Sequence, residues 1–318
     1  HNVWASLHPT QSTFDDTKPL TALWFGGGQD STALILMLRD GDEFREKYAK
    51  HNVVIVMSDT GNEYDNTYEN VVLMREWCYQ NNLDFYFLTP QMGYHTPTWQ
   101  SLTEQFERNN NLMMVTGKKS CTDKLKIQPC YHFLNEYIGQ KYGIENYSRK
   151  RGIRKYFKKF GKLEVIIGFG RGEADRIKKY DSLLKDPRAD WMRDCIQMIF
   201  PLLDLGMDRS DCQKYIISQG YPLPMPSNCM MCPFQNGVEL VYLQRFEPDT
   251  IDQMEIYEQN KLKAAKSRGI EDKRNYGIRG LKPFRYYVNK SAEKHKDLTD
   301  DEVREYKMSH GHCVKSKY

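Results

Sequence analysis

The chain of 318 residues lacks any apolar run that approaches the roughly 20 residues of a membrane-spanning helix. No basic and apolar leader typical of a secretory signal is visible, and there is no internal repeat or low-complexity tract. The eight cysteines are irregularly spaced, unlike a secreted disulfide framework. We therefore expect a cytoplasmic protein without a membrane partner, in which some cysteines serve metal or redox chemistry.

Apolar segments alternate with segments of helical pattern along the first two thirds of the chain. This alternation predicts an α/β fold with a doubly wound, mostly parallel sheet, whose ligands bind at the carboxyl ends of the strands. The predicted strands are residues 20–25, 52–57, 83–88, 163–168 and 196–199, and the predicted helices cover about 32–39, 65–79 and 122–137, with Pro129 expected to bend the last.

The most informative stretch is Gly26-Gly27-Gly28-Gln29-Asp30-Ser31-Thr32, between the first predicted strand and a helix. A strand, a glycine loop and a helix together present backbone N–H groups and a positive helix end to a phosphate. A Walker loop would have Lys-Ser or Lys-Thr after its glycines, and a Rossmann fingerprint would space them differently. Neither is present, so this motif alone leaves open a phosphate loop or an ordinary glycine turn.

Four further segments follow in a fixed order: Asp59–Glu63, Cys121–Pro129, Gly168–Arg176, and Phe200–Leu203 with Ser227–Phe234. With the glycine loop they resemble the phosphoadenosine phosphosulfate reductase family of PP-loop ATP pyrophosphatases, most nearly its DNA phosphorothioation sulfurtransferase branch. The usual PP-loop is Ser-Gly-Gly-x-Asp-Ser, and Gly26 replaces its first Ser. The resemblance covers about Leu20 to Phe234 and implies an adenine nucleotide α-hydrolase-like fold.

This organisation predicts three parts: a lead-in over 1–19, a PP-loop nucleotide-binding α/β domain over 20–204, and a smaller, mainly helical part over 205–318. The last part begins with a helix over 209–218, is helical from about Pro233 to Ser267, and is basic and irregular from there to its end.

The glycine loop is expected to hold the phosphates of ATP, or of an adenylyl sulfate nucleotide, while the Asp30 carboxylate orients Mg²⁺ or the attacking group. Arginine side chains suit phosphate and can stabilise a pyrophosphate leaving group, although a surface salt-bridge cluster is the alternative. Asp59 is expected to bind a ribose hydroxyl or a metal. Glu63 either does the same or is the N-terminal acid of a helix, and Lys126 is expected to contact the nucleotide. The predicted cofactor-binding residues are Gly26, Gly27, Gly28, Gln29, Asp30, Ser31, Thr32, Asp59, Thr60 and Gly168, and the predicted catalytic residues are Asp30, Lys126, Arg171, Glu173 and Arg176.

Cys229 and Cys232 form a C-x₂-C pair, a spacing that suits one metal or cluster, a redox disulfide or half of a zinc site. The resemblance implies Cys121 as a third ligand and a [4Fe–4S] cluster with one open iron that binds the sulfur to be transferred. Ser120 stands where cluster-bearing reductases have another cysteine. Structural zinc, completed from the tail by Cys313, is the alternative.

Residues 149–162 carry eight Lys or Arg and no acid, interleaved with Tyr156, Phe157 and Phe160. This basic insertion, over about 148–162, suits phosphate neutralisation with base stacking, and a solvated insertion is an equal alternative. The predicted partner is nucleic acid, DNA or tRNA, and the resemblance adds a cysteine desulfurase as sulfur donor.

Three functions remain open at this point. The first is an ATP-dependent sulfurtransferase that adenylates a substrate oxygen and replaces it with sulfur. The second is a reductase of adenylyl sulfate or its 3′-phosphorylated form, whose usual C-terminal Glu-Cys-Gly-Leu-His motif has no match in Ser309–Val314. The third is a non-catalytic nucleotide- or DNA-binding regulator of the same fold.

Overall fold

The computed structural model describes residues 13–110, 112–117, 120–173, 176–178 and 190–310. The chain divides into two compact units. Unit 1 holds the residues up to Ser58, Asn66–Tyr94 and Ile127–Pro224, and unit 2 holds Asp59–Asp65, His95–Lys126 and the residues from Met225 onward.

This division differs from the domain boundaries expected from the sequence. The α/β unit continues beyond residue 204 to Pro224, and two connections from the first half of the chain belong to unit 2. The reason is packing: Leu102 and Phe106 share one apolar core with Met254 and Phe284 from the C-terminal region.

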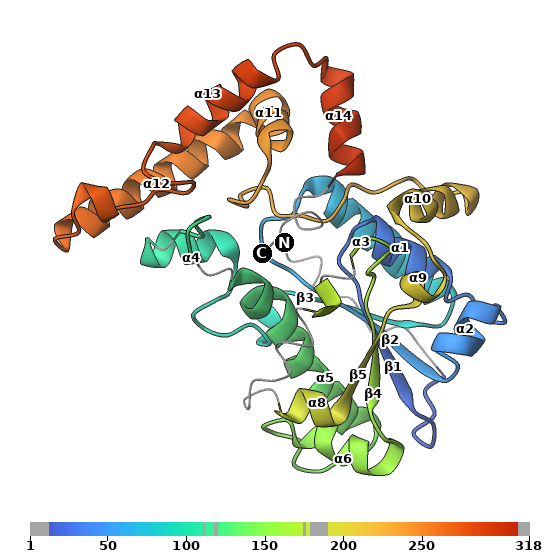
Figure 1. Ribbon diagram of the computed structural model, residues 1–318. Coiled ribbons are helices and arrows are strands. Elements are labelled where there is room, and N and C mark those ends of the chain that lie inside the picture. Colours follow the sequence, from blue (N-terminus) through green and yellow to red (C-terminus); the bar gives the residue numbers. More distant parts are fainter. Residues whose placement is uncertain (1–12, 111, 118–119, 174–175, 179–189, 311–318) are drawn as a thin grey trace. The chain divides into compact units, whose positions relative to one another are not determined.

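Unit 1 is built on a five-stranded sheet in which every pair of neighbouring strands is parallel. The strand order is β3-β2-β1-β4-β5, and all five strands predicted from the sequence are confirmed (Figure 1). Leu20 lies opposite Asn52 in the β1–β2 register, and Thr21 lies opposite Glu164 in the β1–β4 register. The strands are β1 Leu20–Trp24, β2 Asn52–Ser58, β3 Asp84–Leu88, β4 Leu163–Ile166 and β5 Ile196–Ile199.

The strand order reverses between β1 and β4. From β1 the chain builds outward through β2 to β3, and it then returns to add β4 and β5 on the other side of β1. In open parallel sheets, ligands bind outside the carboxyl ends of the strands at such a reversal. The two loops at this point contain the glycine run Gly26–Gly28 and Gly168.

Helices cover both faces of the sheet, so the doubly wound α/β fold is confirmed (Figure 1). One face packs residues such as Leu34, Val71 and Ile216, and the other packs Leu134 and Ile153. The first layer contains α1 Gln29–Leu36, α3 Asp65–Gln80 and α10 Arg209–Ser218, and the second contains α5 Gln128–Lys141, α6 Arg151–Phe160 and α8 Asp190–Cys195. The shorter helices are α2 Glu43–Tyr48, η1 Pro90–Met92 and α9 Pro201–Asp204.

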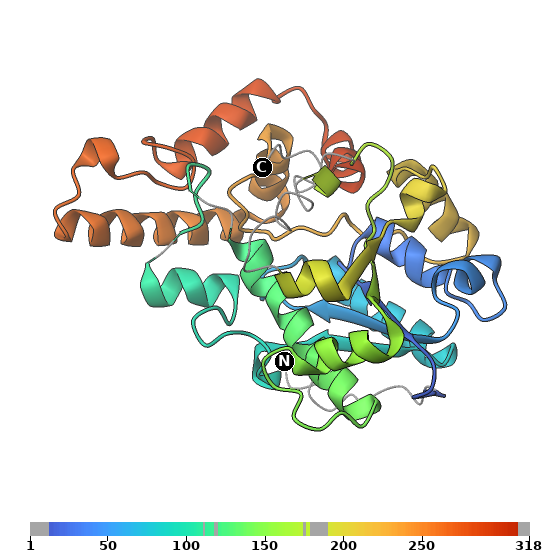
Figure 2. The same cartoon turned by 60° about the horizontal axis from the view of Figure 1, so that its bottom comes forward.

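The basic run forms α6 and belongs to a helical layer of the sheet, where the sequence suggested an insertion. Ile153 and Tyr156 are buried on one face of this helix, while its cations lie on the other. Helix α6 packs beside α5 (Figure 2, both in green). The tyrosine hydroxyl accepts a hydrogen bond from the Leu20 N–H at 2.7 Å, which ties α6 to the first residue of β1.

The helix predicted from residue 122 has two parts. Residues Thr122–Ile127 form the π-helical segment η2, and α5 continues from Gln128. Pro129 lies in the first turn of α5, where a missing N–H costs little, and the change of helix type falls just before it. Short π-helical segments inside helices often mark functional sites.

Unit 2 is mainly helical around the core that contains Phe106, Met254 and Phe284. The irregular ending expected after Ser267 is wrong, because two helices follow. They were missed because buried apolar residues are sparse in them, with Phe284 and Val288 in one and Val303 in the other. The elements are α4 Leu102–Asn109, α11 Gly237–Phe246, α12 Pro248–Ser267, η4 Asp272–Arg274, α13 Phe284–Lys294 and α14 Asp300–Ser309. None of the described helices is long and apolar enough to cross a membrane.

Candidate nucleotide and thiol sites

The glycine loop of unit 1 turns sharply from β1 into α1. Gly27 has φ +77°, and a Cβ atom on it would lie 2.5 Å from Thr67 Cγ2, so a side chain is excluded here. Gly28 is the N-cap of α1, and no side chain caps this helix end. The loop therefore presents a helix N-terminus in an arrangement that fits the phosphates of a nucleotide.

Hydroxyl groups in the first turn of α1 brace the loop. Ser31 Oγ accepts a hydrogen bond from the Gly26 N–H at 3.1 Å and donates one to the Gly28 carbonyl at 3.2 Å. Thr32 Oγ1 donates to the same carbonyl at 2.9 Å. Gln29 is buried, and its amide bonds to Gln213 Nε2 at 3.0 Å and to the Pro224 carbonyl at 2.8 Å. The Gln29 side chain therefore anchors the loop to later parts of unit 1.

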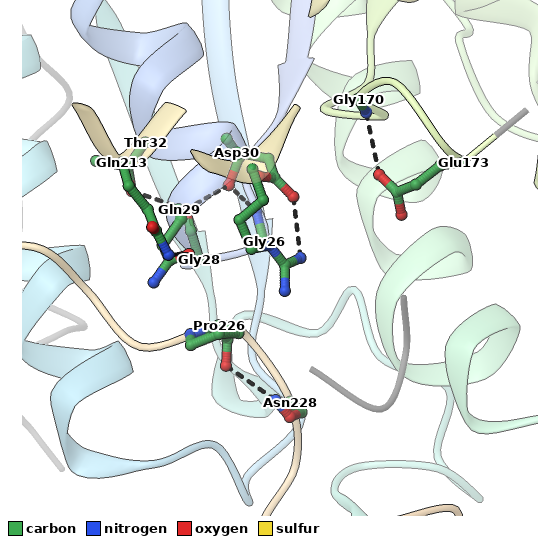
Figure 3. A network of polar contacts seen from close by, with 12 residues as sticks. Gly26, Gly28, Gln29, Asp30, Thr32, Gly170, Glu173, Gln213, Pro226 and Asn228 are labelled. Carbon is green, nitrogen blue, oxygen red and sulfur yellow. Dashed lines mark hydrogen bonds and ion pairs between the residues drawn. The ribbon is translucent and has the colours of Figure 1, made fainter. Parts of the chain in front are cut away.

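Asp30 lies in the first turn of α1 (Figure 3) and forms an ion pair with Arg209. Asp30 Oδ2 is 3.1 Å from Arg209 Nη2. The other oxygen, Oδ1, is buried and has no hydrogen-bond partner among the described residues. Burial raises the pKa of Asp30, while Arg209 works against this shift. A buried carboxylate oxygen of this kind suits a hard cation such as Mg²⁺.

The loop after β4 passes directly against the first turn of α1. A Cβ atom on Gly168 would lie 3.3 Å from the Ser31 backbone nitrogen, so only a glycine allows this approach without a shift. Further along the loop, the buried Glu173 accepts a hydrogen bond from the Gly170 N–H at 3.0 Å (Figure 3). Glu173 Oε1 also forms an ion pair with Arg176 Nη1 at 2.6 Å.

Three of the predicted residues, Asp30, Glu173 and Arg176, are linked by charge in unit 1. Glu173 raises the pKa of Asp30, and Arg176 lowers it, which places both within electrostatic reach of the glycine loop. Arg171 is different, because its side chain is 68% exposed and pairs with Asp208 at 3.0 Å. Asp208 caps α10, the helix that begins with Arg209. Arg171 therefore takes part in a surface salt bridge, which was the alternative to a phosphate contact in the sequence analysis.

Arg209 was missed by the sequence interpretation. It is the first residue of a helix in a region not assigned to the site, and its distance from Asp30 in the chain gives no local signal. The capping pattern Asp208-x-x-Asp211 marks the helix start, and the ion pair is visible only in the fold.

Unit 2 surrounds the Cys229 thiol with polar groups. The thiol donates to Thr60 Oγ1 at 3.5 Å and lies 3.8 Å from Glu63 Oε1. Thr60 Oγ1 donates to the same Glu63 oxygen at 3.0 Å, and Lys126 Nζ pairs with it at 2.9 Å. Burial raises the pKa of Cys229 well above its ordinary value; Glu63 adds to the shift and Lys126 opposes it.

Glu63 is therefore more than the helix-terminal acid expected from the sequence. Helix α3 begins at Asp65, and Glu63 is buried in an extended bridge with Cys229. Lys126, predicted to touch the nucleotide, is engaged with this carboxylate. Asp59, the other strand-end acid, accepts a hydrogen bond from the Gly61 N–H at 2.8 Å, and its carbonyl contacts His95 Nε2 at 2.9 Å.

The three predicted metal ligands all belong to unit 2. Cys121 and Cys229 pack against the same apolar core, and the N–H of the buried Cys232 donates to the Cys229 carbonyl at 3.3 Å. Among the described residues, no group of three or more His, Cys, Asp or Glu could hold a metal ion. A [4Fe–4S] cluster or zinc at these cysteines therefore stays a prediction.

The other cysteines have simpler surroundings. Cys78, Cys130, Cys195 and Cys212 are buried in the cores of unit 1. The tail residue Cys313 lies outside the described residues.

No protein-family model matches this chain, and no curated protein matches it. The chain is similar to the solved structure of the U34-tRNA thiolase NcsA from Methanococcus maripaludis with its [4Fe-4S] cluster, at 13% identity and a TM-score of 0.34. The alignment covers 91% of this chain and 82% of that one. A likeness this distant says nothing about the activity of this chain, which is argued from its own residues.

Proposed function

We propose that the chain is an ATP pyrophosphatase-type enzyme that adenylates a substrate oxygen. The observation that carries the proposal is the placement of the glycine loop and Asp30 where the strand order reverses between β1 and β4. Two features support a nucleotide there: an uncapped helix N-terminus beside the loop, and the buried Asp30 Oδ1 that lacks a partner among the described residues.

Each residue has a stated role in this proposal. Backbone N–H groups at Gly28–Ser31 bind the phosphates, and Asp30 holds the Mg²⁺ that accompanies ATP. A substrate oxygen attacks the α-phosphorus; the new O–P bond forms as the bond to the bridging oxygen breaks, and pyrophosphate leaves with the electron pair. Arg176 and Arg209 lie near Asp30 and offset the negative charge of the leaving group.

The finer proposal is that sulfur replaces the adenylated oxygen, which makes the enzyme a sulfurtransferase. The substrate oxygen by itself is a poor leaving group, and adenylation allows it to leave as part of AMP, which is a good one. With sulfide as the simplest donor, the bond to the adenylated oxygen breaks as the bond to sulfur forms, and AMP is released. The thiols of unit 2 and the polar groups around Cys229 support sulfur chemistry.

The point at which ATP is cleaved tests the adenylation step. We expect pyrophosphate and a labelled adenylated substrate, with no ADP, when the protein is incubated with Mg²⁺, ATP labelled at the α-phosphate and candidate oxygen-bearing substrates, and labelled AMP once sulfide is added. Asp30→Asn should lower the rate by about 10²–10³-fold, the usual effect of removing a positioned charge at a reacting centre. The exposed Asp40→Asn is the matched control. Release of ADP and phosphate would refute the proposal.

Metal analysis tests the predicted cofactor separately. Anaerobically purified protein should contain about four irons and four sulfides per chain if the cluster forms. Cys121→Ser, Cys229→Ser and Cys232→Ser should each lose them, and Cys78→Ser should not. One zinc per chain without iron would assign these cysteines a structural role.

Nucleic acid is the proposed substrate class. The support is helix α6, on which Arg154, Lys155, Lys158 and Lys159 are exposed and Phe157 is 37% exposed. Lys155→Gln/Lys158→Gln/Lys159→Gln should weaken binding of an oligonucleotide and flatten its dependence on salt. Unchanged binding and salt dependence would remove α6 from the interface.

A further inference from the structure

A second basic segment lies in unit 2, in the part of the chain expected to be irregular. Residues 261–290, called here the basic arm, contain ten Lys or Arg and two acids, Glu271 and Asp272. The arm comprises the end of α12, η4, the loop after it and the first half of α13. Helices α12 and α13 lie side by side (Figure 1). The arm is therefore a surface distinct from α6, which belongs to unit 1.

The loop of the basic arm is built onto α12. The buried Glu258 carboxylate accepts hydrogen bonds from the Ile278 N–H at 2.8 Å and from the Phe284 N–H at 2.7 Å. A Cβ atom on Gly277 would clash with Glu258 Oε1, so a side chain is excluded where the backbone passes this carboxylate. Lys261 Nζ also bonds to the Tyr276 carbonyl. The surface is therefore held in a defined shape before any partner binds.

The cations of the arm fall into two groups. Some are neutralised within the protein: Arg285 pairs with Asp252 and Glu255, and Lys273 pairs with Glu271. Five others are exposed and have no ion-pair partner among the described residues: Lys263, Arg268, Arg274, Lys282 and Lys290. Cations near the C-terminus of α12 complement its macrodipole, but this does not account for those beyond the helix.

Exposed aromatic and apolar side chains accompany these charges. Tyr276 is 38% exposed, Tyr286 46% and Leu281 55%. Lys282 Nζ lies 5.9 Å from the centre of the Tyr286 ring, and Tyr286 packs edge-on against Tyr287 at 5.4 Å. Proteins bind single-stranded nucleic acid with such a combination, because lysines neutralise the phosphates and exposed tyrosine rings stack on the bases.

We infer that the basic arm binds a single-stranded segment of nucleic acid. Its phosphates meet the unpaired cations, and its unstacked bases lie on Tyr276 and Tyr286. A duplex hides its bases and would use only the charges. The inference rests on the proposed function only for the substrate class, nucleic acid. It assigns to unit 2 a binding surface that is separate from the predicted α6 interface.

Fluorescence anisotropy with a labelled 20-nucleotide oligo(dT) tests the inference, on the full chain without ATP. Lys263→Gln/Arg274→Gln/Lys282→Gln should reduce the slope of log affinity against log salt by about 2, at about 0.7 per phosphate contact. Tyr276→Ser/Tyr286→Ser should weaken binding by roughly 5- to 150-fold for each stacked base and leave the slope unchanged. Lys47→Gln/Lys50→Gln/Lys214→Gln, exposed in unit 1, is the matched charge control.

A duplex of the same length, oligo(dA)·oligo(dT), separates stacking from charge. The tyrosine variant should bind this duplex as wild type does, because paired bases cannot stack on the rings. The inference is overturned if both arm variants bind oligo(dT) like wild type. It is also overturned if the charge control Lys47→Gln/Lys50→Gln/Lys214→Gln loses as much oligo(dT) binding as the arm variants. Binding to phosphatidylserine vesicles is measured in parallel, and a loss of vesicle binding alone in the arm variants would overturn the inference too.

The outcome is independent of the adenylation proposal. If wild-type protein releases no pyrophosphate but the arm variants lose oligo(dT) binding, the proposed activity fails and the inference stands. If arm variants release pyrophosphate and bind oligo(dT) normally, the inference fails and the activity stands. Far-UV circular dichroism of each variant confirms that the helices are retained.

Discussion

At the residue scale, the ion pair between Lys126 and the buried Glu63 organises the polar groups around the Cys229 thiol. Both residues belong to segments that the motif order brought to attention. That order could not show that a carboxylate and a lysine so far apart in the chain would meet beside Cys229. Only the tertiary fold defines such a pair, as it does for Asp30 and Arg209. Glu63 is fully buried, and the Lys126 side chain is 34% exposed.

Removing Lys126 should therefore affect folding more than nucleotide binding. Lys126→Met leaves a buried carboxylate without its cation and should lower the free energy of unfolding by about 2 kcal/mol. This is less than the 3–5 kcal/mol typical of a fully buried pair, because the lysine is partly exposed. Urea unfolding measures the change, and calorimetry with Mg²⁺–ATP should show unchanged affinity.

The exposed pair Lys50–Glu46 provides the control for this prediction, since Lys50→Met should cost about 0.5 kcal/mol or less. If Lys126→Met instead abolished nucleotide binding at unchanged stability, Lys126 would be the nucleotide contact that the sequence suggested.

At the element scale, α6 shows why a charge run is a poor guide to structure. The cations dominate its composition, but Ile153 and Tyr156 on the opposite face fix it to the sheet. Tyr156 also accepts a hydrogen bond from the first residue of β1. The helical spacing of these two residues was present in the sequence, but the eight cations concealed it.

Tyr156 should make unfolding sensitive to alkaline pH. Burial raises the pKa of Tyr156 to about 12, above its ordinary value of about 10. A raised pKa means that the folded state binds the phenolic proton more tightly than the unfolded state does. The contribution of this proton to the free energy of unfolding is therefore complete below pH 10 and is lost as the pH rises toward 12. Two pKa units correspond to about 2.7 kcal/mol. The difference in unfolding free energy between wild type and Tyr156→Phe should shrink over this range in urea titrations.

Other buried tyrosines titrate in the same range, so the comparison of the two proteins carries the test. A difference that stays constant from pH 9 to 12 would show that the Tyr156 hydroxyl is not buried beneath α6 as described.

Helix α14 has a comparable anchor in unit 2. Lys307 is almost completely buried, and its Nζ lies 3.3 Å from Asn228 Oδ1 and 3.5 Å from Glu239 Oε1. Asn228 precedes Cys229, so α14 holds the turn that carries this thiol. The lysine also lies 4.6 Å from the centre of the Tyr64 ring.

Lys307→Met should loosen that turn. We expect faster alkylation of Cys229 by iodoacetamide at a fixed pH, followed by peptide mass spectrometry, because the buried thiol becomes accessible more often. Lys296→Met, an exposed lysine paired with Glu293, should leave the rate unchanged. Equal rates in wild type and Lys307→Met would mean that α14 does not position the turn.

At the scale of the whole molecule, local patterns predicted the sheet well and the division of the chain poorly. Each strand is a short apolar run with clear ends, so the α/β class and the loop after β1 followed directly. The strand order and the two discontinuous units depend on packing between distant segments, such as Phe106 against Phe284. The thiol surroundings, the position of Arg209 and the helical structure of the basic arm were hidden for the same reason.

The central claim is that a nucleotide binds where the sheet order reverses, between the ends of β1 and β4. Hydrogen–deuterium exchange with and without Mg²⁺ and α,β-methylene-ATP, which cannot be cleaved at the proposed bond, tests it most directly. We predict protection of backbone amides in peptides covering Gly26–Leu34 and Ile167–Glu173, and no such protection in Asp30→Asn. Protection confined to other strand ends, with both peptides unchanged, would contradict the account.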